Sequence, residues 1–281
     1  MVAKKKKSNI FRRGKHKFAT DIRNDVTMII TWYGQQDCLL RQCMFYSDMA
    51  KEYNMIPKVI IINDGHEDER DFFHETIKSF KKAFDLTGVD VLNDVGFNSH
   101  TCRNLGVKLA KTDWVWLLDT DCFESEDIYR HLRFERQLKE DEFYVPRALM
   151  DYPEDMSGYE LLDPKGLIKY KTHPNSWIMT KECFWSTGGY DIEFQGVRQG
   201  DGEFFLAIGR DGYKQWDYGL LSEDKRHHII VSYPKREPWY IRQDPWKQNE
   251  ARNLIDFVRT RNTNPYRKYR KRIHDMEWEY V

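Results

Sequence analysis

The feature that most constrains the fold is an alternation of apolar segments and amphipathic segments between residues 26 and 119. Short β-branched runs bounded by turn residues indicate buried strands, and apolar spacings of three and four indicate helices between them. The predicted strands are 26–34, 57–65, 89–93 and 113–119, and the predicted helices are 37–53, 71–84 and 102–109. Because parallel strands require crossover connections, the pattern predicts an α/β fold with helices on both faces of a sheet.

The alternation becomes less regular after residue 121. Pattern and turn residues predict further helices, strands and a Pro/Gly-rich loop. The expected segments are a helix near 126–139, a strand at 143–148, the loop at 151–174, a strand at 175–181, and helices at 202–210 and near 247–260. The chain has no internal repeat.

The charge is unevenly distributed. The net charge is zero, yet residues 1–20 carry +8 and residues 235–281 carry +5, which leaves −13 for residues 21–234. Basic ends suggest an anionic macromolecular partner, and the alternative is a solubilising N-terminal arm. No run approaches the ~18–20 apolar residues of a membrane span, and no apolar segment follows the basic start. We therefore expect a cytoplasmic protein without a transmembrane segment.

The cysteines support an internal, reducing location. The chain has five of them, an odd number, and their spacing has no CxxC or Cys/His zinc pattern. Buried structural thiols are the expected role.

Polar residues follow the ends of the predicted strands. Thr31 and Tyr33 lie at the first strand end, Asp64 ends the second, and Asp119 and Asp121 end the fourth. Open α/β sheets bind ligands at the carboxyl ends of their strands. The chain has neither GxGxxG nor GxxxxGK[ST], so the dinucleotide and P-loop classes are not supported.

The segment Asp119-Thr120-Asp121 directly follows the hydrophobic WVWLL. Two carboxylates separated by one residue can hold one hard divalent cation, either Mn²⁺ or Mg²⁺, and the cation would neutralise charge on a departing diphosphate. The structural alternative is a solvated turn. Asp64 could accept a hydrogen bond from a nucleobase or close a turn beside Gly65. Arg103 could pair with Asp64, contact a nucleotide or lie on the surface.

The order of these motifs resembles the nucleotide-binding half of GT-A-fold glycosyltransferases, particularly the inverting family two. The matching motifs are IITWYGQQDCLLRQC, VIIINDGHED, CRNLGVKLA and WLLDTD, followed by STGGYDIEF and GDGEFFLAIGRDGY. The resemblance covers roughly residues 26–215 and implies a Rossmann-like GT-A mixed sheet flanked by helices. It divides the chain into a basic arm (1–21), a nucleotide-sugar-binding half (22–121), an acceptor-binding half (122–234) and a basic, aromatic C-terminal extension (235–281).

The resemblance also implies roles for individual residues. The donor, a nucleotide-sugar and most simply a UDP-sugar, would be bound by the loop Thr31-Trp32-Tyr33 together with Asp64, Arg103, Asp119 and Thr120. The cation would be held by Asp119 and Asp121, with His228 as a further ligand. The alternative for His227-His228 is a polar surface loop.

The candidate catalytic base lies in the second half. The family's "ED" corresponds here to Gly200-Asp201-Gly202-Glu203, so either Asp201 or Glu203 is the base, with Asp201 preferred. A carboxylate near the acceptor takes the hydroxyl proton as the oxygen attacks the anomeric carbon, which inverts that centre. The sequence also departs from the family at Asn63 and His66, which replace the first Asp and the Ser of "DDGS".

The sequence predicts a metal-dependent glycosyltransferase and leaves the acceptor open. The basic arm and the tail NPYRKYRKRIH favour a modified base in double-stranded, for instance viral, DNA, because Lys and Arg engage phosphates and Tyr can stack on an extruded base. The alternative is a cytosolic glycan, lipid-linked or protein acceptor. A non-catalytic GT-A-like binding module is the third interpretation.

Overall fold

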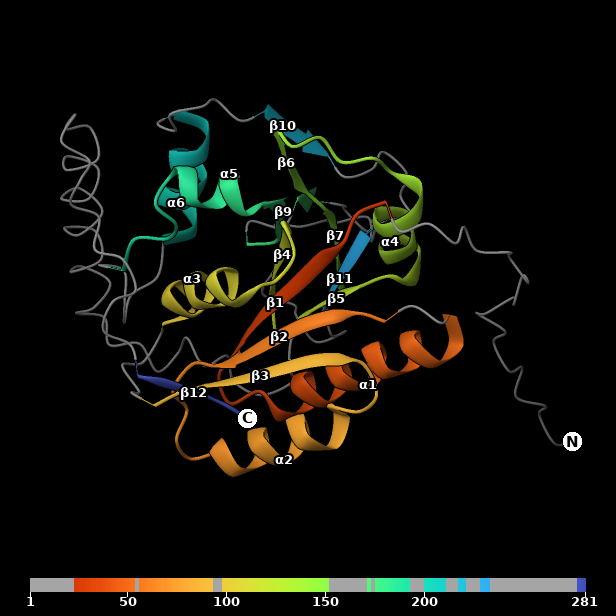
Figure 1. Ribbon diagram of the computed structural model, residues 1–281, viewed down its shortest axis with the longest axis vertical. Helices are drawn as coiled ribbons and strands as arrows, with labels where there is room; N and C mark the ends of the chain where they lie inside the picture. Colours follow the sequence, from red (N-terminus) through yellow and green to blue (C-terminus); the bar gives the residue numbers. More distant parts are fainter. Residues whose placement is uncertain are drawn as a thin grey trace, which may run out of the picture.

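The computed structural model describes residues 23–53, 56–92, 98–151, 171–172, 175–192, 200–210, 217–220, 228–232 and 277–281. The central element is an eight-stranded mixed sheet with the strand order β10-β6-β9-β4-β1-β2-β3-β12 (Figure 1). Its strands are β1 (Val26–Trp32), β2 (Lys58–Asn63), β3 (Asp85–Val91), β4 (Trp114–Asp119), β6 (Glu142–Val145), β9 (Trp177–Thr180), β10 (Asp217–Leu220) and β12 (Trp278–Tyr280). Helices flank the sheet, so the predicted α/β class is confirmed.

The middle of the sheet is parallel, as predicted. β4, β1, β2 and β3 pair in parallel, and β9 and β12 add antiparallel neighbours on either side. The crossover helices are α1 (Gln36–Tyr53), α2 (Arg70–Phe80) and α3 (Ser99–Leu109). The strand predicted at 89–93 begins earlier, at Asp85, because the polar segment before it continues the ladder with β2, starting from the pair Lys58 and Asp85.

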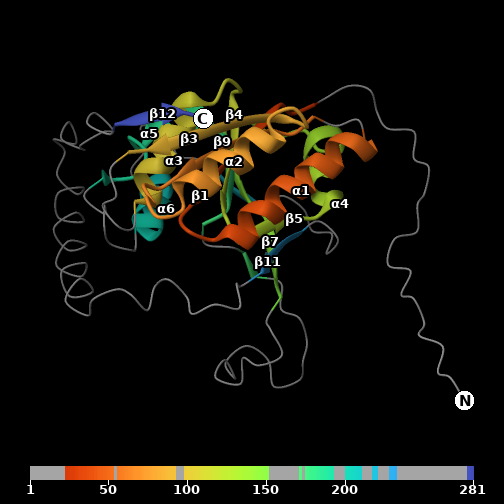
Figure 2. The same cartoon turned by 90° about the horizontal axis from the view of Figure 1, so that it is seen from below.

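The two faces of the sheet pack against different helices. The helices α1 and α2 cover one face, and α3, α5 (Lys181–Ser186) and α6 (Gly200–Arg210) cover the other (Figures 1 and 2). In β1, Met28, Ile30 and Trp32 pack with residues of α1 and α2, whereas Ile29 packs with residues of α3, α5 and α6. This alternation follows from the two-residue period of a strand. All seven residues of β1 are buried, as expected for a central strand covered on both faces.

A second sheet begins directly after β4. It has the order β5-β11-β7-β8, with β5 (Cys122–Glu124), β11 (His228–Ser232), β7 (Arg147–Asp151) and β8 (Lys171–Thr172). Sequence periodicity did not predict β5, because a three-residue strand is too short to have a period. The strand β11 pairs with β5 and β7, so the chain from the second half returns beside the Asp119–Asp121 loop.

The helix predicted at 126–139 is shorter than expected. It consists of α4 (Glu126–Arg130) and one π-helical turn, His131–Glu135. The amide of Asn24 donates to the carbonyl oxygens of Leu132 and Arg136, and its own carbonyl accepts from the Leu138 backbone. A side chain distant in the sequence therefore ends this helix, which local periodicity cannot reveal.

Strands from both predicted halves lie in the large sheet, since β6, β9 and β10 follow residue 122. The basic arm 1–21, the helix near 247–260 and most of the predicted loop 151–174 lie outside the described residues.

No helix in the described part of the chain is long and apolar enough to cross a bilayer. All five cysteines are buried thiols that form no disulfide bond with one another, as predicted.

The Arg-Asn-Leu-Gly segment of α3 fixes this helix on the sheet. The Asn104 side chain accepts a hydrogen bond from the Tyr190 backbone nitrogen at 2.8 Å and donates to its carbonyl oxygen at 2.9 Å. At Gly106 a β-carbon would lie 2.3 Å from Ile29 Cγ2 and 3.1 Å from Ile62 Cδ1. Glycine is thus required for α3 to approach β1 and β2 this closely.

Replacing Gly106 by alanine is expected to destabilise the protein by about 1–3 kcal/mol, because the added methyl group overpacks a rigid interface between a helix and a sheet. Urea unfolding measures the change. The matched control is Gly202→Ala, since a β-carbon at this helical glycine meets no atom within 4 Å. The control is expected to leave stability unchanged or to raise it, and an equal loss in both variants would contradict the packing argument.

Candidate active site

The predicted donor residues converge at the carboxyl ends of adjacent parallel strands. Thr31 in β1 is in register with Asp119 in β4, and Trp32 with Asn63 in β2. The turn after β2 stays beside β1, because the Asp64 backbone nitrogen donates to the Trp32 carbonyl oxygen at 2.9 Å. Parallel pairing brings these strand ends to one sheet edge although they are far apart in sequence.

The Asp119-Thr120-Asp121 loop is tied to two elements. The Thr120 hydroxyl donates to the Thr31 carbonyl oxygen at 2.6 Å, and the Gln42 amide of α1 donates to the Thr120 carbonyl oxygen at 3.2 Å. Oxygen atoms of Asp119 and Asp121 and the sulfur of Cys122 all lie within 4.8 Å of one another. The loop therefore holds two carboxylates close enough for one cation.

The electrostatics of this pair fit a hard divalent cation. Burial raises the pKa of Asp121 and the negative charge of Asp119 raises it further, to about 7. A bound cation would relieve this repulsion. Burial also raises the pKa of the Cys122 thiol well above its ordinary value. The groups that could hold a hard cation here are the carboxylate oxygens of Asp119 and Asp121.

Arg103 lies between this pair and the second half of the chain. Its side chain is 1% exposed, and its guanidinium donates from Nη2 to Asp119 and from Nη1 to Asp201. Nη1 also donates to the Tyr190 hydroxyl at 3.1 Å. Burial opposes the charge on Arg103, but Tyr190 and the two carboxylates raise its pKa above its usual range. The sequence-based pairing with Asp64 is therefore corrected: Arg103 bridges Asp119 and Asp201.

Asp201 lies in the first turn of α6, with its side chain 16% exposed. Its second carboxylate oxygen lies 3.4 Å from Nε2 of His100, one helical turn before Arg103. Burial alone would raise the pKa of Asp201, but Arg103 and His100 hold it well below its usual range. The side chain is thus ionised at neutral pH and fixed beside the Asp119–Asp121 loop.

Asp64 has hydrogen-bond partners of its own in the site. Its carboxylate accepts hydrogen bonds from the Asn98 backbone nitrogen at 2.9 Å and from the Cys102 thiol at 3.2 Å. It therefore anchors the start of α3 as well as lying at the end of β2. The neighbouring Asn63 donates to the buried carboxylate of Asp90 at 2.8 Å, which explains the departure from "DDG", since an aspartate at position 63 would repel Asp90.

The predicted loop Thr31-Trp32-Tyr33 is divided between core and surface. Trp32 is fully buried and stacks on Phe73 with ring centroids 5.3 Å apart, so its side chain belongs to the core. Thr31 is 8% exposed. Tyr33 is half-buried and meets the His66 ring edge-on at 4.5 Å. Of the three side chains, Tyr33 is the one best placed to meet a ligand.

His228 is the first residue of β11, not part of a loop as the alternative interpretation had it. In the register of β11 with β5, Val231 lies opposite Cys122. His228 is three residues, or about 10 Å, farther along the strand. This is the register of the backbone alone, and the role of His228 as a further ligand of the cation stays a prediction. Glu203 lies in α6 one residue beyond Gly202.

Three residues near the site were not predicted as part of it: His100, Tyr190 and Asn175, whose amide donates to Asp119 at 3.0 Å. His100 could have been found, because it precedes Arg103 by three residues and shares its helix face. Tyr190 follows the Gly188-Gly189 turn, but it lies near Arg103 because the Asn104 side chain forms hydrogen bonds with its backbone. Asn175 carries no sequence signal.

Glu124 gives the region a pH dependence. It accepts a hydrogen bond from the Tyr46 hydroxyl at 2.9 Å, and burial raises its pKa from 4.5 to about 7. The folded protein thus binds this proton more tightly than the unfolded chain. The stabilisation of the folded state by the bound proton is fully present below pH 4.5 and is lost as the pH rises through 7. Relative to Glu124→Gln, the wild type is expected to lose on the order of 3 kcal/mol of unfolding free energy between pH 4.5 and 8.

Urea unfolding of both proteins at pH 5 and pH 8 tests this expectation. A stability difference between them that is the same at both pH values would contradict it.

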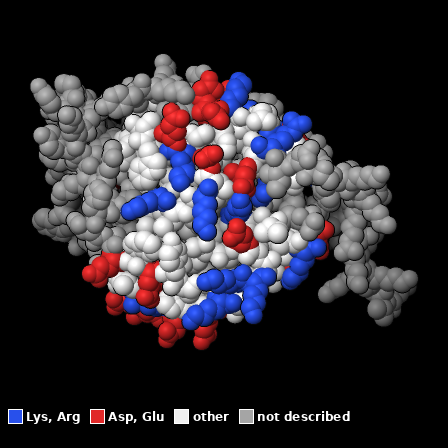
Figure 3. Space-filling model, in the orientation of Figure 1, with Lys and Arg blue, Asp and Glu red and all other residues white. Residues whose placement is uncertain are grey.

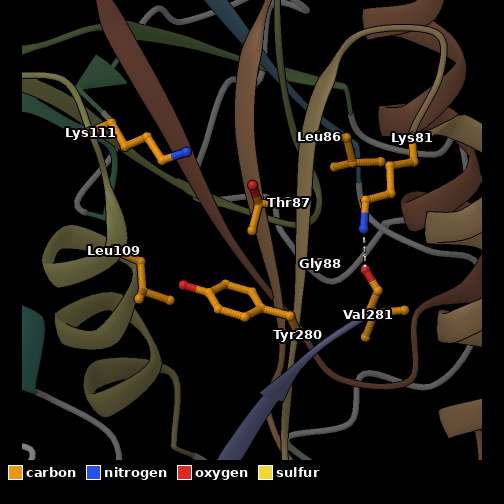
Figure 4. A pocket seen from close by; sticks show the side chains of 8 residues that line it. All are labelled: Lys81, Leu86, Thr87, Gly88, Leu109, Lys111, Tyr280 and Val281. Atoms are coloured by element: carbon orange, nitrogen blue, oxygen red, sulfur yellow. Dashed lines mark hydrogen bonds between the residues drawn. The ribbon is translucent and has the colours of Figure 1, made fainter.

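A cavity of about 190 Å³ lies at the other end of the sheet, between the start of β3, the end of α3 and the strand β12 (Figure 4). It is lined by Lys81, Leu86, Thr87, Gly88, Leu109, Lys111, Tyr280 and Val281. The Lys81 ammonium donates to the Val281 carbonyl oxygen at 2.8 Å. None of the predicted site residues lines this cavity.

Comparison with known proteins agrees with this arrangement. Residues 27–142 match the family model described as "Glycosyltransferase like family 2". A solved structure of GalNAc-T7 with UDP, GalNAc and Mn²⁺ is similar, with 14% identity, a TM-score of 0.52, and coverage of 83% of this chain and 48% of that one. The chain thus spans about half the length of that relative. No curated protein sequence matches the chain.

Two further solved structures are similar at lower scores. A mutant of the Drosophila β-1,4-galactosyltransferase 7 with manganese, UDP-Gal and xylobiose has 14% identity, a TM-score of 0.48, and coverage of 80% of this chain and 78% of that one. The S. aureus TarS structure has 12% identity, a TM-score of 0.49, and coverage of 83% and 43%.

The family match covers the strands and helices that carry Asp64, Arg103, Asp119 and Asp121. The likeness to GalNAc-T7 extends the same fold beyond that segment. Residues 27–142 are therefore similar to the glycosyltransferase family 2 model, and the described residues have the GT-A fold.

Proposed function

We propose that this protein is a metal-dependent, inverting glycosyltransferase that moves a sugar from a UDP-sugar to a hydroxyl acceptor. The observation that carries the proposal is that one guanidinium, that of Arg103, contacts both Asp119 and Asp201. A single displacement needs a leaving-group site and a proton acceptor within one site. The family match and the UDP and Mn²⁺ bound to GalNAc-T7 support the choice of donor and cation.

Each carboxylate has a role in this proposal. Asp119 and Asp121 would hold Mn²⁺ or Mg²⁺, which supplies positive charge to the departing diphosphate. Asp64 and Tyr33 would hold the nucleotide base at the ends of β2 and β1. Asp201 would accept the proton from the attacking hydroxyl, with Glu203 as the alternative base.

A thermal-shift experiment tests the donor half of the proposal. UDP and UDP-sugars are expected to raise the melting temperature in the presence of Mn²⁺ and to lose this effect in EDTA, because only the folded state binds them. Asp121→Asn should remove the shift, whereas Asp25→Asn, at the opposite end of β1, should retain it. A shift that persists in EDTA, or none with any nucleotide-sugar, would reject the proposal.

The stereochemistry can be tested without an acceptor. With water as the acceptor, inversion converts a UDP-α-sugar into the free β-anomer, which proton NMR detects before mutarotation. Initial release of the α-anomer would reject the single displacement.

For the acceptor, the charge of the chain ends supports double-stranded DNA, with a cytosolic glycan, lipid-linked or protein acceptor as the alternative. On the face shown in Figure 3, basic and acidic side chains of the described residues are interspersed, so the DNA proposal depends on the basic ends. Binding of duplex DNA should weaken steeply between 50 and 200 mM salt. Salt-insensitive binding, or none, would favour the glycan class.

A further inference from the structure

The buried Arg103 has two acidic partners that belong to different halves of the site. Asp119 lies at the end of β4 on the donor side, and Asp201 lies at the start of α6 on the acceptor side. The guanidinium donates to one carboxylate through Nη2 and to the other through Nη1. With 1% of its side chain exposed, Arg103 cannot exchange either partner for water.

The position of Arg103 is fixed from both sides. Asn104 holds α3 to the Tyr190 backbone, and Gly106 lets α3 pack against β1 and β2. The Tyr190 ring lies under the guanidinium at 5.5 Å and stacks on Phe204 at 4.2 Å. Because the helix and the ring keep the guanidinium in place, a change in the charge at one carboxylate alters the interaction of Arg103 with the other carboxylate.

We propose that Arg103 is a positioning residue that couples cation binding at Asp119 and Asp121 to the charge on Asp201. The inference rests on the proposed function and deepens it. A divalent cation at Asp119 would repel the guanidinium that shares this carboxylate, and Asp201 would then hold the positive charge of Arg103. Such coupling is reciprocal, so the state of Asp201 changes the affinity for the cation.

The test measures cation affinity and not turnover. Mn²⁺ is titrated in the presence of UDP, and free Mn²⁺ is followed by electron paramagnetic resonance. Asp201→Asn keeps the shape of the side chain but removes its charge, so Arg103 interacts more strongly with Asp119 and competes with Mn²⁺. The affinity for Mn²⁺ is expected to fall by about fivefold or more.

A double-mutant cycle separates this coupling from direct attraction between Asp201 and Mn²⁺. In an Arg103→Gln background, Asp201→Asn is expected to change the affinity by less than about twofold, as for independent sites. If Arg103→Gln does not fold, Arg103→Lys replaces it, because one ammonium cannot hold both carboxylates. The matched control Asp25→Asn removes a carboxylate at the opposite end of β1 and should leave the affinity unchanged.

The outcomes distinguish the inference from the proposed function. The coupling is overturned if Asp201→Asn leaves the affinity for Mn²⁺ unchanged, or if it lowers this affinity equally in the wild-type and Arg103→Gln backgrounds. In either case, binding of Mn²⁺ and UDP by the wild type would still support the glycosyltransferase proposal. If the wild type binds no Mn²⁺ with UDP, both are overturned.

Discussion

Asp121→Asn is expected to lower metal-dependent UDP release by about 10³-fold or more, because a cation that stabilises a diphosphate leaving group contributes several kcal/mol to the transition state. Asp121 supplies one of the two carboxylates that lie within 4.8 Å of each other. The amide in the variant is a neutral and weaker ligand. A site built on two carboxylates would keep only one of them.

The measurement is UDP release from a UDP-sugar at saturating Mn²⁺, with water as the acceptor. Loss of folding would mimic loss of activity, so melting temperatures are compared. The variant is expected to be at least as stable as the wild type, because Asp121 is buried beside Asp119 and its pKa is raised to about 7 by burial and by that charge. Full UDP release by a folded Asp121→Asn protein would remove the metal site from the mechanism.

Asp201→Asn is expected to lower UDP release by about 10²–10⁴-fold when donor and Mn²⁺ are saturating, as is typical when a general base is lost. Saturation is required, because the same variant is expected to bind Mn²⁺ more weakly. The pKa of Asp201 is held well below its usual range by Arg103 and His100, against the effect of burial. The carboxylate is thus ionised throughout the neutral range, as a proton acceptor must be.

Glu203→Gln is the matched control for this prediction, since Glu203 is in the same helix and is the alternative base. It is expected to retain most of the wild-type rate. The reverse result, a fast Asp201→Asn and a slow Glu203→Gln, would exchange their roles. In that case Asp201 would remain the partner that orients Arg103.

The parallel centre of the sheet was largely predictable because β1, β2 and β4 are buried on both faces and appear as mostly apolar runs. The start of β3 was missed, because its first residues are polar. The second sheet was not predictable, because the three residues of β5 have no period and its partner β11 lies more than 100 residues later. The end of the helical segment 126–135 was missed for a similar reason, since the Asn24 side chain makes the hydrogen bonds that follow its π-helical turn.

The candidate site was predicted in part. Motif order led to Asp64, Asp119 and Asp201, and parallel topology explains why the first two share one sheet edge. For Arg103 the sequence offered a pair with Asp64, contact with the nucleotide or a surface position. Packing of α6 against α3 instead buries Arg103 between Asp119 and Asp201, and its contact with the nucleotide stays a prediction.

The sequence alone determined the α/β alternation, the carboxylates at the strand ends and the glycines of the turns, because these depend on local periodicity and backbone conformation. Tertiary structure alone decided that Arg103 is shared by Asp119 and Asp201, and that Trp32 belongs to the core. The physical reason is that ion pairing and burial depend on distances between segments, and a sequence does not contain those distances until the sheet and its helices have packed.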